Sequence, residues 1–241
     1  MRDTVKFTNK GNIKMIAHRG VSGLEMENTC PAFLVAGVKS YYGIETDVHV
    51  TKDGKYILFH DNTLTRILGV DKVVEESMFD ELRAYRMKDL DGVTERADLF
   101  LPSLEEYIAI CKKYNKVAVL ELKNPTEETH IYRIAEIIRE KGWLDKTTFI
   151  SFIGNNLVAL RKKYANVQAQ FLTEYPTEEN LQFMIQNSLD ADLRMSCLTK
   201  EYVDKLHGAG RKVNCWTVNT LENAQKAKEL GVDFITTNIL E

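Results

Sequence analysis

Cysteine and proline are scarce in this chain. The 241 residues include four prolines and four widely spaced cysteines, with no C-x-x-C pair. A disulfide framework needs a denser set, so the spacing indicates a reducing compartment and cysteines that belong to the core. A Pro/Gly-rich linker, an internal repeat and a low-complexity tract are also missing. We therefore expect a single domain over residues 1–241, although length alone also allows two.

Long hydrophobic runs and an excess of basic charge are absent too. The first twelve residues are polar and charged, without the apolar stretch that a signal peptide or a spanning helix requires. The 32 basic and 35 acidic residues give a formal net charge of -3, and no basic run occurs. Such a chain does not attract nucleic acid or anionic lipid. We expect a cytoplasmic protein that binds no nucleic acid and does not associate stably with membranes.

Strand-like apolar segments alternate with amphipathic helix-like segments along the chain, as in a parallel sheet covered by helices. The expected strands are 15–18, 43–48, 116–122, 148–152, 167–172, 191–195, 212–218 and 233–237. The expected helices are 31–36, 104–114, 129–141, 156–164, 178–187, 199–207 and 220–230. Eight strands in a chain of this length predict an α/β fold, a single (β/α)8 TIM barrel.

Several of these helices have terminal signals. Ser103 and Glu106 have the spacing of a capping box at the start of the second helix. Gly142 and Gly231 stand where the third and the last helix should stop. These signals support the alternation independently of its hydrophobic pattern.

One apolar segment, 56–60, does not fit the alternation. It follows the second strand too closely for a parallel crossover, which needs about a dozen residues. The Asp-Gly pair at 53–54 favours a hairpin turn. We therefore expect 56–60 to run antiparallel to the second strand and to bring His60 roughly opposite Thr46 and Asp47.

The region from 61 to 102 is charged and has only short apolar patterns. It is expected to form a cap near the top of the barrel. With the hairpin strand, the insertion after the second strand then covers roughly 51–102.

The chain continues for only a few residues after its last predicted strand. The eighth helix that usually closes such a barrel should therefore be short or missing. The seam beside the first helix would be left partly uncovered, which allows a homo-oligomer.

Carboxylates recur at the carboxyl ends of two predicted strands. Glu45 and Asp47 are two residues apart on the second strand and so share a face, and Glu121 and Lys123 repeat this spacing on the third. Adjacent buried carboxylates require a proton or a cation, and an all-oxygen set suits one hard ion, Mg²⁺ or Ca²⁺. Each pair alone is more often a solvated or salt-bridged pair. Their shared position at the active-site end of a barrel favours a metal site.

Histidines and a cation lie at the same end of the predicted barrel. His18 ends the first strand and His60 ends the hairpin strand, and both can exchange protons near neutral pH. Arg19 follows His18 in a loop, where its guanidinium can bind phosphate oxygens together with Lys123. Structural roles in the core are the alternative for each residue alone. Together they suit displacement at phosphorus with a bound metal.

Eight short motifs occur in order along almost the whole chain. They are His18-Arg19-Gly20, Glu27-Asn28-Thr29, Glu45-Thr46-Asp47, Asp53-Gly54, His60-Asp61, Glu121-Leu122-Lys123, Ser151-Phe152 and Cys215-Trp216-Thr217-Val218-Asn219. Each motif alone is weak, but the ordered set resembles the glycerophosphodiester phosphodiesterase family. The resemblance implies that Glu45, Asp47 and Glu121 bind the divalent cation. It also implies that His18 and His60 serve as acid and base.

The resemblance further implies a small-molecule glycerophosphodiester substrate. Arg19 and Lys123 would hold its phosphate, and Trp216 would line the pocket and pack against the glycerol carbons. The glycerol 2-hydroxyl would attack phosphorus to give a cyclic phosphate, which water would open to glycerol 3-phosphate. Trp216 as plain barrel filling is the alternative from sequence alone.

The chain departs from the family pattern at two positions. Met26 stands where the family usually has proline, and Asn238 stands where an aspartate commonly follows the last strand. Neither belongs to the expected metal set or to the histidine pair. Glu27, which follows the first strand in a loop, suits an orienting role better than a place in the metal shell.

Two other functions share this architecture. A lipid-cleaving phospholipase would need an apolar surface near the mouth, whereas the apolar residues of 61–100 are mixed with many charges. A non-catalytic phosphoester-binding barrel would have lost a histidine or a metal carboxylate, and all of these are present. The hydrolase is the function that the sequence favours.

Overall fold

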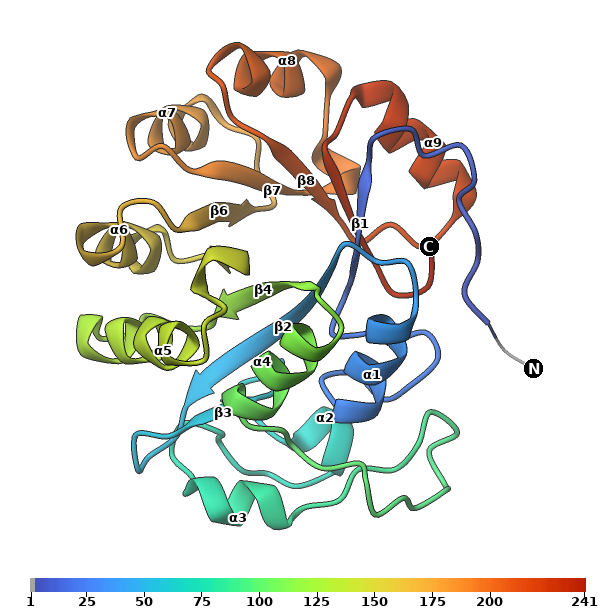
Figure 1. Ribbon diagram of the computed structural model, residues 1–241, viewed down its shortest axis with the longest axis vertical. Coiled ribbons are helices and arrows are strands. Elements are labelled where there is room, and N and C mark those ends of the chain that lie inside the picture. The colour runs from blue at the N-terminus through green and yellow to red at the C-terminus, as the bar shows by residue number, and fades with distance from the viewer. Residues whose placement is uncertain (1–2) are drawn as a thin grey trace.

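A closed ring of parallel strands forms the centre of the protein (Figure 1). The computed structural model describes residues 3–241, and within them eight parallel strands follow the order β1-β9-β8-β7-β6-β5-β4-β2, with β2 pairing back onto β1. They are β1 Lys14–Ala17, β2 Gly43–Val50, β4 Val117–Leu122, β5 Thr147–Ser151, β6 Gln168–Thr173, β7 Asp190–Arg194, β8 Val213–Trp216 and β9 Phe234–Thr237. The predicted (β/α)8 TIM barrel is confirmed.

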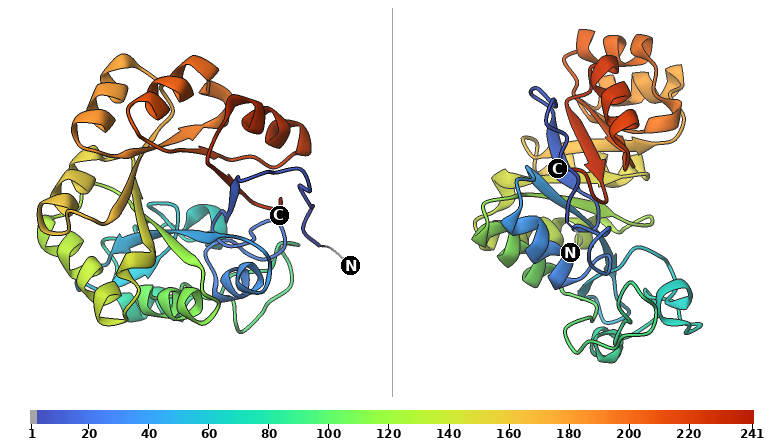
Figure 2. Two further views of the ribbon diagram at one scale, coloured as in Figure 1. Left: turned by 45° about the horizontal axis from the view of Figure 1, so that its top comes forward. Right: turned by 90° about the vertical axis from the view of Figure 1, so that its right-hand side faces the viewer.

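Helices that connect successive strands cover the outside of this ring (Figures 1 and 2). They are α1 Cys30–Val38, α4 Leu104–Lys113, α5 Glu128–Glu140, α6 Gly154–Lys163, α7 Glu178–Gln186, α8 Lys200–Gly208 and α9 Leu221–Leu230. Short 3₁₀ turns occur at Leu144–Lys146 and Met195–Cys197. Each helix expected from the sequence is present, with ends displaced by at most two residues.

Side-chain caps explain where several of these helices begin. Five helices start after a hydroxyl side chain that accepts a backbone hydrogen bond from the first turn, and these residues are Thr29, Ser103, Thr177, Thr199 and Thr220. Ser103 and Glu106 form the predicted capping box. Gly231 ends α9 in the left-handed conformation at φ 88°, as its position in the sequence suggested.

The strand β3, Tyr56–Leu58, forms the hairpin that the sequence predicts. It pairs antiparallel with β2, and Val48 lies opposite Leu58. One residue further along, the Phe59 amide donates to the Asp47 carbonyl at 3.1 Å. This register carries His60 to the position opposite Thr46, so the hairpin delivers a histidine beside the acidic residues of β2.

The segment after this hairpin forms a small layer beside β3 (Figures 1 and 2). It contains the short helices α2 Thr65–Leu68 and α3 Phe79–Ala84. Its apolar side chains, among them Leu64, Leu82 and Leu99, pack with Ile57 and Phe59 of the hairpin into a second hydrophobic cluster. The insertion is therefore anchored on the barrel through β3. Its role as a cap stays a prediction.

Apolar side chains fill the inside of the barrel below the carboxyl ends of the strands. Ile16, Val119, Ile150, Leu172 and Phe234 come from five different strands and form one buried cluster. A larger cluster lies between the strands and the outer helices. The interior is thus solid at this level, and the open volume lies above it, at the end of the barrel where active sites of this fold occur.

The two ends of the described chain pair with each other beside β1 and β9 (Figure 1). The Val5 amide donates to the Ile239 carbonyl at 3.0 Å, and the Phe7 amide donates to the Glu241 carbonyl at 2.7 Å. Leu240 is fully buried. Among the described residues no helix follows β9, as expected, but this pairing covers the seam. The reason for expecting a homo-oligomer is removed, and the oligomeric state stays an untested prediction.

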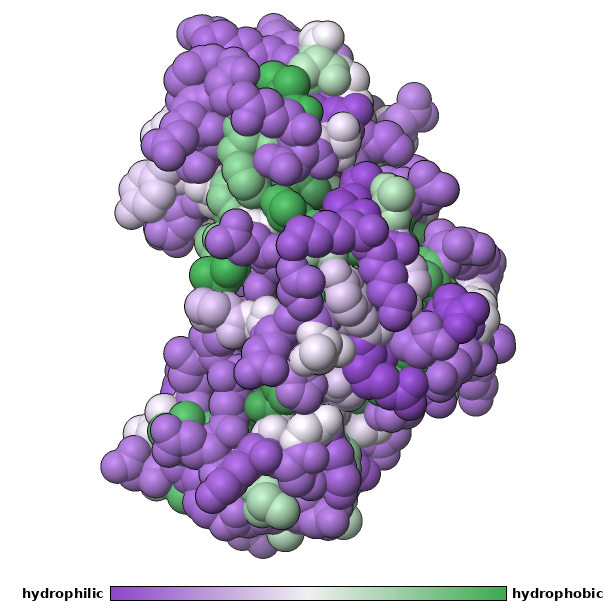
Figure 3. Space-filling view, turned by 90° about the vertical axis from the view of Figure 1, so that its left-hand side faces the viewer, coloured by the Kyte–Doolittle hydropathy of each residue, from purple (hydrophilic) through white to green (hydrophobic). Residues whose placement is uncertain are grey.

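The face that Figure 3 shows, which includes the side of the barrel near α5, α6 and α7 in Figure 1, is mainly hydrophilic with scattered apolar side chains. Across residues 3–241, none of the helices combines the length and the apolar character that a membrane crossing requires.

Candidate active site at the carboxyl ends of the strands

Three buried carboxylates meet at the carboxyl ends of β2 and β4. Glu45 and Asp47 lie on β2, and the parallel register places Asp47 beside Glu121 of β4. One oxygen from each carboxylate lies within 4.8 Å of the others, and the residues are only 3%, 1% and 7% exposed. The two pairs that the sequence placed on adjacent strands are therefore brought together as one cluster.

The cluster cannot hold three negative charges without compensation. Burial and the charge of Asp47 raise the pKa of Glu121 to about 8, and the same two causes raise the pKa of Glu45 well above its usual range. Burial also disfavours the charged form of Asp47, but Lys123 and Arg19 outweigh it and hold the pKa of Asp47 low. A bound cation would remove the need for protons on the two glutamates.

The donor set fits a hard divalent ion. Asp47 Oδ1 is buried and accepts no hydrogen bond from the described residues, and Lys123 Nζ lies 3.5 Å from it. Its other oxygen accepts a hydrogen bond from Asn28 Nδ2 at 2.8 Å, which fixes the carboxylate. Clustered carboxylate oxygens with one unpaired acceptor are the ligands that Mg²⁺ and Ca²⁺ prefer.

Asn28 is a site residue that the sequence reasoning did not single out. Its amide binds Asp47, and its Oδ1 accepts from the Thr46 hydroxyl at 2.6 Å. Both Asn28 and Arg19 adopt positive φ values of 54°, so two tight turns bring the loop after β1 onto β2. The Glu-Asn-Thr motif was the available signal, but only the folded loop shows that its asparagine orients a carboxylate.

His18 lies at the end of β1 and faces Glu45. Its Nδ1 is 2.7 Å from Asn238 Oδ1, so Nδ1 carries the hydrogen and Nε2 is free, 4.0 Å from Glu45 Oε2. Burial, together with the nearby charge of Arg19, lowers the pKa of His18 to about 4. The ring is therefore neutral at neutral pH, with a free basic nitrogen toward the pocket.

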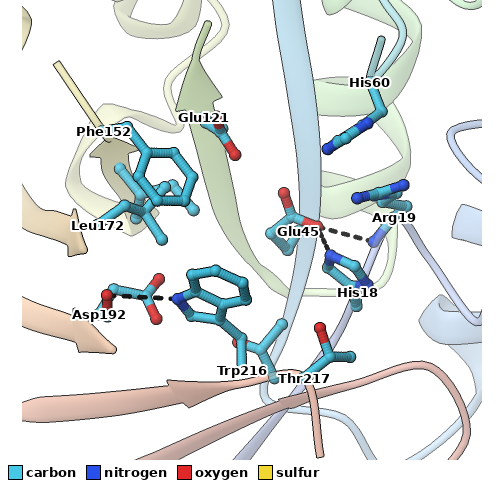
Figure 4. A pocket seen from close by; sticks show the side chains of 12 residues that line it. His18, Arg19, Glu45, His60, Glu121, Phe152, Leu172, Asp192, Trp216 and Thr217 are labelled. Atoms are coloured by element: carbon cyan, nitrogen blue, oxygen red, sulfur yellow. Dashed lines mark hydrogen bonds and ion pairs between the residues drawn. The ribbon is translucent and has the colours of Figure 1, made fainter. Parts of the chain in front are cut away.

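His60 enters the same space from the hairpin (Figure 4). Its Nδ1 is 2.6 Å from Asp61 Oδ1, and Arg66 of α2 holds the other Asp61 oxygen at 2.6 Å through Nε. Burial lowers the pKa of His60, while Asp47 and Asp61 act in the opposite direction. The Asp61 contact leaves Nε2 of His60 free.

Two cations border the carboxylates. Arg19 Nη1 donates to Glu27 at 2.9 Å, and its Nε is buried without a hydrogen-bond partner among the described residues, 3.7 Å from Asp47. Lys123 Nζ lies 3.0 Å from Glu121. Glu27 is therefore a partner of Arg19, and the three-carboxylate cluster does not include it.

An open pocket connects these groups with an aromatic wall (Figure 4). Its enclosed volume is about 90 Å³. The residues that line it are His18, Arg19, Glu45, His60, Glu121, Ile150, Phe152, Leu172, Asp192, Trp216, Thr217 and Thr236. Trp216 meets Phe152 edge to face, with ring centroids 5.7 Å apart. The predicted pocket residue Trp216 thus lines the cavity, and Asp192, which the sequence reasoning missed, lies beside it.

Fold and pocket together define a class: β/α-barrel enzymes whose polar active site, built on carboxylates and histidines, lies at the carboxyl ends of the strands. The model of the glycerophosphoryl diester phosphodiesterase family matches residues 18–241. The chain belongs to this family and is a phosphoric diester hydrolase.

Individual relatives agree with this assignment. The chain is 28% identical to a glycerophosphodiester phosphodiesterase of Bacillus altitudinis, across 93% of this chain and 94% of the relative. A phosphodiesterase of Oleispira antarctica, solved with the product sn-glycerol-3-phosphate, has the same fold at a TM-score of 0.83 and 24% identity, covering 93% of this chain and 92% of that one. A glycerophosphodiester phosphodiesterase of Parabacteroides distasonis is similar at a TM-score of 0.77 and 25% identity, covering 94% and 93%.

Proposed function

We propose that this protein hydrolyses glycerophosphodiesters to glycerol 3-phosphate and an alcohol, with a divalent cation and two histidines. The observation that carries the proposal is the meeting of His18 and His60 at a buried carboxylate cluster, each with Nδ1 engaged and Nε2 free. Family membership supports the reaction, and so does the sn-glycerol-3-phosphate bound to the Oleispira relative.

Glu45, Asp47 and Glu121 are the proposed ligands of one Mg²⁺ or Ca²⁺ ion. When bound, the ion would offset the negative charge of the phosphate as attack proceeds. The Asp47 oxygen that accepts no hydrogen bond from the described residues and the raised pKa values of the two glutamates support this role. Asn28 keeps Asp47 in the orientation that the site needs.

Arg19 and Lys123 are the proposed phosphate-binding residues. Both side chains border the carboxylates and are mostly buried, at 16% and 14% side-chain exposure, so a phosphate there would meet cations that water screens poorly. The Arg19 Nε hydrogen has no partner among the described residues and is available to a ligand. Trp216 would cover the glycerol carbons.

The histidines divide the proton transfers between them. His18 is neutral at neutral pH and has Nε2 free, so it can take the proton of the glycerol 2-hydroxyl as that oxygen attacks phosphorus. His60, whose positive charge Asp61 stabilises, then gives a proton to the departing alcohol. The product is a 1,2-cyclic phosphate. Water opens it with the two roles reversed, which releases glycerol 3-phosphate and restores both rings.

We also propose that residues 1–241 act as one domain, in which the 51–102 insertion positions His60. Arg66 of the insertion binds both Asp61 and Glu27. Asp61 is the hydrogen-bond partner of His60 and Glu27 is that of Arg19, so Arg66 links the two. The insertion therefore borders the active site instead of standing apart from it. A cytoplasmic location is proposed from the cysteines, since all four are free thiols.

Product analysis with three substrates tests the proposed reaction. Glycerophosphocholine, glycerophosphoethanolamine and glycerophosphoglycerol would each be incubated with Mg²⁺, with Ca²⁺ and with chelator. We expect glycerol 3-phosphate in the metal-containing samples and its loss with chelator. Release of glycerol 3-phosphate at the same rate with chelator as with metal would contradict the metal site. Absence of product from all three substrates would contradict the reaction.

A further inference from the structure

The pocket contains a carboxyl group that neither the metal site nor the histidine pair uses. Asp192 lies on β7 and lines the pocket beside Trp216, across from His18, Arg19 and His60 (Figure 4). It is only 2% exposed. Its Oδ1 is buried and accepts no hydrogen bond from any residue of the described chain. A native protein rarely buries such an acceptor without a partner, so its position beside a cavity calls for a ligand.

The neighbouring strands give Asp192 one polar neighbour. Leu172 lies beside it on β6, and Asn214 lies beside it on β8. Asn214 Nδ2 donates one hydrogen to the Thr236 hydroxyl at 2.8 Å, and as a hydrogen-bonding neighbour Asn214 lowers the pKa of Asp192 against the larger effect of burial. Trp216 Nε1 donates at 3.3 Å to the backbone carbonyl of Asp192 and not to its carboxylate. Asp192 Oδ1 is therefore the oxygen that remains without a hydrogen-bond partner among the described residues.

The Trp216 hydrogen bond fixes the position of Asp192 relative to the aromatic wall. The contact joins the end of β8 to the middle of β7, so the indole and the carboxyl group border the same part of the pocket. Burial raises the pKa of Asp192 to about 7, which leaves both protonation states accessible near neutral pH. A hydroxyl group suits either state, since it donates to a carboxylate and accepts from a carboxylic acid.

We propose that Asp192 binds the terminal hydroxyl of the glycerol moiety and so selects glycerophosphodiesters among phosphodiesters. The assignment rests on the proposed function of the same site. With the phosphate at the carboxylates and cations, one arm of the diester has to extend along Trp216 toward Asp192. Asp192, Leu172 and Ile150, which line the pocket there, are buried, so this part suits the small glycerol arm, while a variable alcohol needs the open side.

The choice of glycerol over the leaving alcohol can be tested with one pair of substrates. Glycerophosphocholine has hydroxyl groups only on its glycerol arm. The matched analogue is the phosphocholine diester of propane-1,2-diol, linked through the primary oxygen, which keeps the attacking 2-hydroxyl and lacks only the terminal one. The readout is the ratio of kcat/KM for the two substrates. Errors in enzyme concentration cancel in this ratio, and so do effects of the leaving group, which is the same in both.

We expect the wild-type enzyme to prefer glycerophosphocholine by about 10- to 100-fold, the usual value of a hydrogen bond at a buried polar site. In Asp192→Leu the ratio should fall to near one, because the loss affects only the substrate with the hydroxyl. Asp192→Asn retains a polar partner and should keep most of the preference. Asp192→Ala provides a second test that does not depend on packing a larger apolar side chain.

Glu174→Gln is the matched control, since Glu174 pairs with Arg194 away from the Asp192 carboxyl group, and its ratio should equal that of wild type. Two results would overturn the assignment of Asp192 but leave the proposed function standing. One is an unchanged ratio in Asp192→Leu or Asp192→Ala, and the other is equal turnover of both substrates by wild type. If the wild-type enzyme released no product from either substrate, the proposed function would be overturned, and this assignment with it.

Discussion

At the scale of single residues, the site depends on partners that fix the state of each reactive group. Asn238 orients His18, Asp61 orients His60, and Asn28 orients Asp47. Asn238 gives His18 a neutral partner. Burial and the nearby charge of Arg19 lower the pKa of His18 to about 4, and the hydrogen bond with Asn238 acts against them.

Removal of the His60 imidazole should abolish most of the activity. His60→Ala is expected to lower kcat about 100- to 10,000-fold, the usual contribution of a positioned acid or base. Steady-state kinetics and Mg²⁺ or Ca²⁺ titration measure the two properties separately, and metal affinity should change little. Asp71→Asn, an exposed change in the same insertion, serves as the control. Turnover of His60→Ala near the wild-type rate would remove this histidine from the mechanism.

The acidic cluster should make the metal-free protein sensitive to rising pH. The pKa of Glu121 is raised to about 8 in the folded chain, so its contribution to stability is complete below its ordinary value near 4.5 and is lost as pH rises through about 8. Glu121→Gln should therefore flatten this loss of stability with rising pH. Chemical denaturation of chelator-treated protein between pH 5 and pH 9 measures it.

The same variant should bind Mg²⁺ or Ca²⁺ more weakly, because one proposed ligand loses its charge. Glu76→Gln, an exposed change, provides the control for a general effect of removing a carboxylate. An identical pH slope in wild type and Glu121→Gln would show that Glu121 does not carry the raised pKa.

At the scale of elements, loops and turns bring together residues that lie far apart in the sequence. Gly20 has a φ of 76°, and a Cβ there would lie 2.6 Å from the backbone carbon of Ala32 in α1. The turn that carries His18 and Arg19 therefore packs directly against the first helix. Only glycine satisfies both the left-handed conformation and the close approach.

Gly20→Ala should destabilise the protein and disturb the site at once. We expect a loss of about 2–4 kcal/mol in the free energy of unfolding, because overpacking adds to the strain of a positive φ. The matched control is Gly208→Ala at the end of α8, where an added Cβ meets no atom within 4 Å and should be tolerated. Denaturant unfolding compares the two. Equal stabilities of the two variants would contradict the close packing.

Periodicity and turn chemistry were sufficient to predict the main elements. The eight barrel strands, the hairpin at Asp53-Gly54 and the cap at Ser103 are local signals, so they appear in the sequence. The contacts of Asn28, Arg66 and Asp192 could not be predicted, because each depends on how loops or strands distant in sequence approach one another. Motif resemblance supplied the predicted reactive residues but not the groups that orient them.

At the scale of the whole molecule, segments from both ends of the described chain meet beside the seam between β1 and β9. Glu241 is 3% exposed, and its carboxylate accepts from the Thr4 hydroxyl at 2.5 Å and the Ser40 amide at 2.6 Å, with Lys6 Nζ 2.7 Å away. One side chain thus joins the first segment, the loop before β2 and the residues after β9. The sequence suggested an open seam here. Its cover could not be predicted, because pairing between segments that are distant in the sequence leaves no local pattern.

Glu241→Gln should lower stability by about 1–2 kcal/mol at neutral pH, since hydrogen bonds to a charged acceptor are lost or weakened. Burial opposes the charge, but Lys6, Thr4 and Ser40 outweigh it and lower the pKa of Glu241 to about 2. The stabilisation is therefore present above the ordinary pKa and lost as pH falls toward 2. Thermal melts at several pH values, with Glu229→Gln as control, measure the difference.

One cooperative transition is expected in these melts if the insertion and the barrel are a single domain. A gap between wild type and Glu241→Gln that stays constant down to pH 2 would contradict the ionic role of this side chain.

The central claim is that the buried carboxylates, with a bound cation, and the two histidines convert a glycerophosphodiester into glycerol 3-phosphate. The most direct test follows glycerophosphocholine by phosphorus NMR in one sample, first with Mg²⁺ or Ca²⁺ and then after excess chelator. We predict that the diester signal is replaced by that of glycerol 3-phosphate, with a transient cyclic phosphate, and that conversion stops on chelation. A diester signal that persists with either metal, or conversion that continues in chelator, would contradict the account.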